Sequence, residues 1–394
     1  MHLHPRGPLS TALIDLLSGA GAHGVEDGDG ADLLAGLAAV AVEQADDLVV
    51  DDDVQLALYL LHELHYSGNS LATADEPDGP DWEWHPGLLR CRQVLTRAFE
   101  HQLRDTYARS APGDLADVPA VLFAMARGDL AGDSGSGALA NGRRRPTSVA
   151  SFIARQATLE QLREILVLRS PYQLKEADPH TFAIPRLRGR AKAALVEVQA
   201  DEYGGGRADR MHSELFARSM RSVGLDDRPN GYLDVVPAVV LAAVNALSHF
   251  ALHRRLRGAL CGHLAAFEMT SSLPAKRYVA GMQRLGLDED AWLFFDEHIE
   301  ADAVHEQIAA GDLCGGLLDD EPGLAADVLL GASVCLGLDA RVSEHVLSAW
   351  TGRCSALHVQ LRQGRLAGDA RAPAPLHLLR EAPSSVPDDT RATG

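Results

Sequence analysis

The sequence has only five cysteines in 394 residues, and none of them stands in a Cys-x-x-Cys pair. Scattered cysteines argue against a disulfide framework and against a thiolate metal site, and they are typical of the reducing cytoplasm. Basic residues are also outnumbered, because the formal net charge is −19. An acidic protein of this kind has neither nucleic acid nor an anionic membrane as its expected partner.

Long apolar runs are missing as well. The most apolar stretch, residues 235–247, is too short to span a bilayer and contains Asn245. We expect a buried helix there, starting at Pro237. The first residues of the chain lack the apolar core of a signal peptide. The sequence therefore predicts a cytoplasmic protein that does not bind a membrane.

No stretch alternates apolar and polar residues as β-strands do, whereas helical periodicity is present throughout. We predict an all-α protein with an N-terminal helical region (1–131), a flexible linker (132–146), a main helical domain (147–363) and a disordered tail (364–394). The predicted helices cover residues 8–19, 31–46, 53–66, 87–110, 114–127, 159–176, 188–203, 208–222, 237–252, 254–270, 275–284, 289–309, 321–337 and 340–361.

The predicted helix 289–309 carries the most informative pattern. At about 100° per residue, Phe294, His298, Asp302 and His305 fall along one stripe of its surface. The stripe begins apolar, so this face is expected to be buried, and three polar side chains on a buried face are costly unless something satisfies them. Imidazole and carboxylate at this spacing suit iron, manganese or zinc. A hydrogen-bonded polar core or a wet groove is the alternative interpretation.

Two other segments place polar residues on helices with apolar faces. Glu176 stands near the end of one predicted helix, and Glu202 and His212 flank three consecutive glycines, residues 204–206. On an unbroken helix, positions ten apart would lie about 80° off one line. The glycines allow the helix to unwind, so that both side chains can point inward. A simple turn is the alternative for the glycines.

Taken together, these segments resemble the haem-oxygenase-like diiron oxidases, a helical family also described as iron-containing redox enzymes. The resemblance covers about residues 150–360. It implies a haem-oxygenase-like helical bundle, here with an N-terminal helical extension, and a carboxylate that bridges two metal ions at Glu202. The six metal ligands and catalytic residues that it implies are Glu176, Glu202, His212, His298, Asp302 and His305.

The same resemblance implies an oxidoreductase with two Fe²⁺ ions and dioxygen as co-substrate. Such an oxidase or oxygenase would oxidise a small organic molecule (an amine, amino acid or carboxylic acid) through a bridged peroxo-diiron intermediate, with an external electron donor. Whether the chain forms a homodimer stays open. Arg169 and Arg207 could bind a substrate carboxylate, although exposed ion pairs are the simpler expectation for both. The residues expected to face the substrate are Tyr172, Tyr203, Phe267 and Glu268.

Two alternatives remain at this point. One is a metal-free or haem-binding module of the same fold, in which the polar stripe is a hydrogen-bonded core. The other is a thiaminase-like hydrolase, which needs a nucleophilic cysteine in its cavity. None of the five cysteines stands in a recognisable catalytic pattern; they are Cys91, Cys261, Cys314, Cys335 and Cys354.

Overall fold

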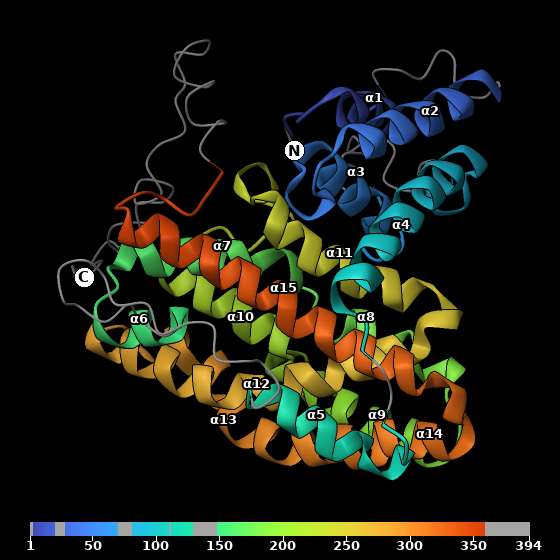
Figure 1. The fold of residues 1–394 in the computed structure, drawn as a ribbon. Coiled ribbons are helices and arrows are strands. Elements are labelled where there is room, and N and C mark those ends of the chain that lie inside the picture. The colour runs from blue at the N-terminus through green and yellow to red at the C-terminus, as the bar shows by residue number, and fades with distance from the viewer. Residues whose placement is uncertain (1–2, 20–27, 70–80, 110–111, 129–147, 359–394) are drawn as a thin grey trace, which may run out of the picture.

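The structure is a computed structural model that describes residues 3–19, 28–69, 81–109, 112–128 and 148–358, without the side chains of residues 28–32 and 300–303. The described residues form helices and no β-strand, which confirms the predicted all-α fold (Figure 1). The predicted linker 132–146 and tail 364–394 lie outside them.

The α-helices vary from a single turn to 28 residues. Between α13 and α14, residues Ile308–Gly315 form a π-helical segment. The bounds are α1 (Pro8–Leu17), α2 (Gly28–Gln44), α3 (Asp52–Glu63), α4 (Pro86–Tyr107), α5 (Val118–Ala126), α6 (Val149–Arg155), α7 (Leu159–Gln173), α8 (Asp178–Thr181), α9 (Gly189–Glu202), α10 (His212–Ser222), α11 (Ala238–Leu252), α12 (Arg257–Arg284), α13 (Glu289–Gln307), α14 (Gly316–Asp320) and α15 (Ala325–Thr351).

The long helix α12 organises the bundle, because α13 and α15 both pack along it (Figure 1). The sequence predicted two helices here, 254–270 and 275–284, and this prediction is wrong. The helix continues through Pro274. A proline inside a helix removes a hydrogen bond and costs about 3 kcal/mol. Packing of α12 against two long neighbours offsets that cost.

The last helix, α15, is also a single helix where two were predicted, at 321–337 and 340–361. Gly337 does not end it. A Cβ atom at this position would overlap the ring of Tyr107 on α4, so the glycine marks a close contact and not a break. The segment Pro322–Thr351 is long and apolar enough to cross a membrane by length and composition, but half of its most apolar window is buried. Its packing along α12 is that of a core helix.

Small residues allow α12 and α15 to approach closely. A Cβ atom on Gly262 would lie 1.8 Å from the carbonyl oxygen of Val328, and a Cβ atom on Gly331 would lie 1.8 Å from the carbonyl oxygen of Ala259. Each helix therefore presents a glycine to the backbone of the other. No other residue fits at either position without moving the helices apart.

The N-terminal helices α1–α4 gather at one end of the molecule, where α3 packs on α11 (Figure 1). A buried carboxylate on α4, Glu100, joins them to the rest of the bundle. Its oxygens accept hydrogen bonds from His249 Nε2 (2.8 Å), Arg104 Nε (2.9 Å) and Arg255 Nη1 (2.7 Å). Arg104 also donates to Asp327 at the start of α15 (3.0 Å). One carboxylate thus connects α4, α11 and the segment before α12.

The close crossing of α12 and α15 predicts a stability difference between two glycine variants. Gly262→Ala should lower the free energy of unfolding by about 1–3 kcal/mol, because the new methyl group meets backbone and not a flexible side chain. Gly36→Ala on α2, where a Cβ atom meets nothing within 4 Å, should be neutral or stabilising by up to about 1 kcal/mol. Chemical denaturation of both variants measures the difference, and equal midpoints would contradict the close crossing.

The surroundings of Glu100 predict a pH dependence. Burial alone would raise the pKa of Glu100, but hydrogen bonds from Arg255, His249 and Arg104 outweigh it and hold this pKa well below its usual range. The stabilisation is therefore present above the unfolded pKa of about 4.3 and is lost as the pH falls toward the folded pKa.

Glu100→Gln should accordingly lower the free energy of unfolding by about 1–3 kcal/mol at pH 7 and by clearly less at pH 3, which lies well below the unfolded pKa. Urea denaturation at the two pH values measures this, with Glu43→Gln at an exposed position of α2 as the control. A Glu100→Gln effect that is the same at both pH values would show that the charge of Glu100 does not matter.

Candidate metal centre

Glu176 is placed by the turn that follows α7. The predicted capping box opens this helix, with the Thr158 hydroxyl accepting from the backbone of Gln161. The prediction that the helix continues to residue 176 is wrong, because α7 ends at Gln173 and the chain turns sharply at Ala177 (φ 77°). The turn directs the Glu176 carboxylate inward, where Gln173 Nε2 donates to its Oε1 atom at 2.9 Å.

Glu202 and His212 are brought together by the glycines between them. Helix α9 ends at Glu202, and the glycines 204–206 all have positive φ angles, of 65°, 62° and 82°. Two short 3₁₀ turns follow, so α10 begins at His212 and not at residue 208 as predicted. The chain therefore doubles back and puts His212 Nδ1 2.9 Å from Glu202 Oε2.

The stripe on α13 is buried as predicted. Phe294, His298 and His305 are all less than 7% exposed. The Nδ1 atom of His298 donates to the carbonyl oxygen of Phe294 (2.6 Å), which leaves Nε2 to face Glu176 Oε1 at 3.8 Å. The His212 and His298 rings lie 4.4 Å apart. Asp302 belongs to the helix, but its side chain lies outside the described residues.

Glu268 on α12 was expected to face the substrate, but the structure puts it beside His305. Its Oε2 atom lies 3.3 Å from His305 Nδ1, and it is 4% exposed. The other ring nitrogen of His305 donates to Asp201 Oδ2 at 3.1 Å. No local sequence pattern marks Glu268 as a partner of His305; only its presence among the apolar residues of a core helix could have drawn attention to it.

These side chains form two groups that could each hold a metal ion. The first consists of Glu176, Glu202, His212 and His298, and the second of Glu202, Glu268 and His305. Within each group the candidate ligand atoms lie within 4.8 Å of one another, and every member is buried. Glu202 belongs to both groups. A carboxylate has two oxygens, so this one can serve two ions at once.

Several atoms of the two groups are not satisfied by hydrogen bonds. Glu176 Oε2, His212 Nδ1 and His305 Nδ1 are buried and make no well-aligned hydrogen bond, although carboxylate oxygens lie 2.9 Å from His212 Nδ1 and 3.3 Å from His305 Nδ1. Buried polar atoms are nearly always satisfied, and carboxylate and imidazole atoms that converge without aligned hydrogen bonds are typical of a ligand set. Carboxylate oxygen and imidazole nitrogen are the donors that non-haem iron prefers. The residues present therefore fit iron.

The charges of the centre lead to the same conclusion. Burial raises the pKa of Glu176, and burial together with the neighbouring Glu268 raises the pKa of Glu202 to about 7. Burial lowers the pKa of His212 to about 4. Burial alone would also lower the pKa of His305, but Glu268 and Asp201 raise it to about 9. Carboxylates crowded in an apolar bundle thus need a positive charge, which a metal ion can supply.

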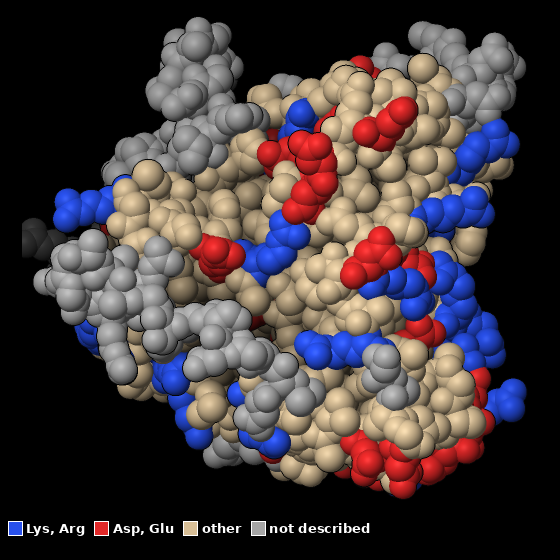
Figure 2. Space-filling view, viewed as in Figure 1, with Lys and Arg blue, Asp and Glu red and all other residues tan. Residues whose placement is uncertain are grey.

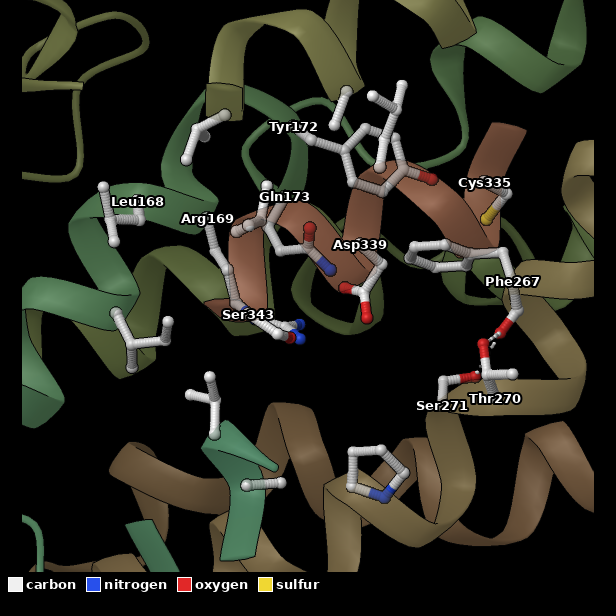
Figure 3. Close-up of a pocket in the computed structure, with 18 of the residues that line it drawn as sticks. Leu168, Arg169, Tyr172, Gln173, Phe267, Thr270, Ser271, Cys335, Asp339 and Ser343 are labelled. Atoms are coloured by element: carbon white, nitrogen blue, oxygen red, sulfur yellow. Dashed lines mark hydrogen bonds between the residues drawn. The ribbon is translucent and has the colours of Figure 1, made fainter. Parts of the chain in front are cut away.

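A cavity of about 260 Å³ adjoins the first group, with Glu176 and His298 in its wall. Tyr172 and Phe267, two of the expected substrate-facing residues, line it with their rings 5.4 Å apart (Figure 3). The third, Tyr203, lies outside this wall, and its hydroxyl donates to Asp178 Oδ1 at 2.8 Å. Cys335 also lines the cavity (Figure 3), although sequence reasoning gave it no role.

Comparison with known proteins identifies the part of the chain that carries this centre. Residues 163–340 match the model of a family described as iron-containing redox enzyme. A nitrosourea synthase from Streptomyces achromogenes subsp. streptozoticus is 28% identical over 144 residues, which cover 36% of this chain and 31% of that relative. The aligned part thus spans about a third of the relative's length. The matched residues 163–340 include every member of the two ligand groups, so the similarity to the iron-containing redox enzymes covers the part of the chain that carries the candidate metal centre.

Proposed function

We propose that this protein is a non-haem diiron oxidoreductase that uses dioxygen to oxidise a small organic molecule. The observation that supports the proposal is the pair of buried ligand groups that share Glu202, next to a cavity of substrate size. When bound there, two ferrous ions would supply the electrons that dioxygen needs. In this proposal Glu176, Glu202, His212 and His298 hold one ion, and Glu202, Glu268 and His305 hold the other.

The protein's own residues prepare the centre by fixing the two histidines of α13. The Phe294 carbonyl accepts the Nδ1 proton of His298 and so presents its Nε2 atom to the first group. Asp201 accepts from His305 Nε2 and so presents Nδ1 to the second group. Partners of this kind fix the tautomer and the ring orientation, and their loss typically costs 10–100-fold in metal affinity.

The aromatic side chains around the centre keep water away from it. Phe294 packs against both His212 and His298, and Phe216 covers Phe294 from α10 with the ring centroids 5.1 Å apart. On the cavity side, Tyr172 and Phe267 lie beside the candidate metal ligands Glu176 and His298 and line the cavity. A dry centre strengthens each charge interaction within it. The organic molecule would enter through the cavity, which reaches Glu176 and His298.

A thiaminase-like hydrolase is disfavoured by the surroundings of Cys335, the cysteine in the cavity wall. Burial and the nearby Asp339 carboxylate raise the pKa of its thiol well above the usual value. A nucleophilic cysteine needs the opposite, an electropositive site that favours the thiolate. The proposal therefore keeps the oxidoreductase and not the hydrolase.

The first prediction concerns iron content. Protein loaded with ferrous iron under anaerobic conditions should bind about two irons per chain without a haem absorption band, and it should consume dioxygen when oxygenated buffer is added. His298→Ala should lose at least one iron and most of the dioxygen uptake while its helical content is retained, because the ligand faces Glu176 from a helix that packing holds in place.

Elemental analysis, a dioxygen electrode and circular dichroism measure these quantities. His101→Ala on α4 is the matched control, since that side chain is 79% exposed and far from the centre in the chain. Full iron and unchanged dioxygen uptake in His298→Ala would refute the assignment of the site.

The second prediction separates the shared carboxylate from those that belong to one group. Glu202→Gln should disturb both ions, because its carboxylate lies in both groups. Glu176→Gln should impair chiefly the ion of the first group, and Glu268→Gln chiefly that of the second. Iron titration followed by Mössbauer spectroscopy distinguishes the two sites, with Glu197→Gln on the exposed face of α9 as the control. If all three variants lost the same single iron, the shared role of Glu202 would be wrong.

A further inference from the structure

Arg169 on α7 is directed into the cavity and not into the exposed ion pair expected from the sequence (Figure 3). Its guanidinium carbon lies 5.0 Å from the centroid of the Tyr278 ring. Among the described residues no carboxylate forms an ion pair with it. Arg207, the other arginine considered, does form the expected exposed pair, with Asp209 at 3.1 Å. Burial alone would lower the pKa of Arg169, but Tyr278 and Asp339 raise it above the usual value, so the guanidinium carries its charge into the cavity.

Asp339 on α15 brings a negative charge to the same part of the cavity (Figure 3). Its side chain is accessible, and the surface that it exposes lines the cavity. Burial within the surrounding protein raises the pKa of Asp339, and Arg169 opposes that increase. No described residue forms an ion pair or a hydrogen bond with the carboxylate. Arg169 and Asp339 are thus close enough to influence each other. Arg169 also forms a hydrogen bond with the side chain of Tyr278, and both charged residues line the cavity.

Arg169 and Asp339 belong to neither ligand group of the candidate metal centre. Glu176 follows Arg169 by seven positions, beyond the end of α7 at Gln173, and lines the same cavity. The rest of the cavity wall is largely apolar and includes Leu168, Val244 and Leu247. A molecule that reached from Arg169 to Glu176 would therefore have a charged group at one end, an apolar middle, and its reacting atom several bonds away.

We propose that Arg169 and Asp339 bind the head group of an α-amino acid, with the carboxylate on Arg169 and the ammonium group on Asp339. The side chain of the amino acid would then extend toward Glu176 and His298. This assignment rests on the proposed function only for its statement that the bound molecule is the substrate.

The signs of the two charges favour a zwitterion over a singly charged ligand. A molecule with a carboxylate alone would satisfy Arg169 and face repulsion from Asp339. An amine alone would satisfy Asp339 and face repulsion from Arg169. A neutral molecule would displace the water around both charges and offer neither of them a partner, which is costly. A head group with both charges on neighbouring atoms compensates both residues at once. Arg169 also offers the forked donors that carboxylates prefer.

Three six-carbon probes test the proposal on the full-length, metal-free protein by isothermal titration calorimetry. Norleucine has both charges at one end, hexanoate has only the carboxylate, and hexylamine has only the ammonium group. Norleucine should bind at least tenfold more tightly than either of the others. Equal affinity for norleucine and hexanoate, or no binding of norleucine, would overturn the proposal.

Two variants assign each charge to its residue. Arg169→Gln should weaken the binding of norleucine and of hexanoate at least tenfold, and it should leave the affinity for hexylamine unchanged or higher. Asp339→Asn keeps the size of the side chain. It should weaken the binding of norleucine and of hexylamine at least tenfold, and it should leave the affinity for hexanoate unchanged or higher. Arg207→Gln is the control and should bind all three probes as the parent does. If both variants lost norleucine binding but did not differ in their affinities for hexanoate and hexylamine, the assignment of the two charges would be refuted.

The outcome does not depend on the metal centre. Norleucine binding that follows the crossed pattern in a protein that binds no iron would support the head-group site and contradict the proposed function. Two bound irons together with no norleucine binding would support the proposed function and contradict the head-group site. Thermal unfolding of each variant by circular dichroism identifies any loss of folding, and Asp339→Asn tests the site independently of Arg169→Gln.

Discussion

The structure depends on how the negative charges of three buried carboxylates are balanced by positive charge. Glu176, Glu202 and Glu268 come from three different segments and meet in the middle of an apolar helical bundle, together with histidines that burial tends to keep neutral. Such a cluster is costly by itself, because charge in a low-dielectric interior needs a partner of opposite sign. His305 supplies part of that compensation. The Oε2 atom of Glu176 is buried without a hydrogen-bond partner, and a divalent cation could supply the remaining compensation.

The rest of the bundle holds these side chains in place. Helix α12 supplies Glu268 and packs against α13, which supplies His298 and His305. Its close crossing with α15 fixes the opposite wall, so that Cys335 and Asp339 line the cavity whose other side is formed by α7. Acidic and basic surface residues are both present on the face seen in Figure 2. The N-terminal helices join this arrangement through Glu100 and leave the metal ligands to the region 163–340.

In the proposed function, the candidate metal centre carries out the chemistry and the cavity recognises the substrate. The centre consists of residues that any substrate would meet, whereas Arg169 and Asp339 line the cavity outside the two ligand groups and present charges of opposite sign. The similarity to the iron-containing redox enzymes concerns the first of these parts. The second is where a protein with the same ligands can select a different molecule, because only charge and shape in the cavity distinguish one small molecule from another.

The sequence by itself determined the local features of this protein. Helical periodicity predicted the all-α fold, the stripe on α13 predicted that His298 and His305 are buried, and the three glycines predicted that Glu202 and His212 can turn toward each other. These features depend on residues that are near in the chain, so their spacing carries the information. Only the tertiary structure decided the partner of Glu268, the continuity of α12 through Pro274 and the direction of Arg169. In each case the deciding contact comes from a helix distant in the sequence: α13 brings His305 to Glu268, α13 and α15 together support α12, and α12 and α15 supply the Tyr278 ring and the Asp339 carboxylate near Arg169.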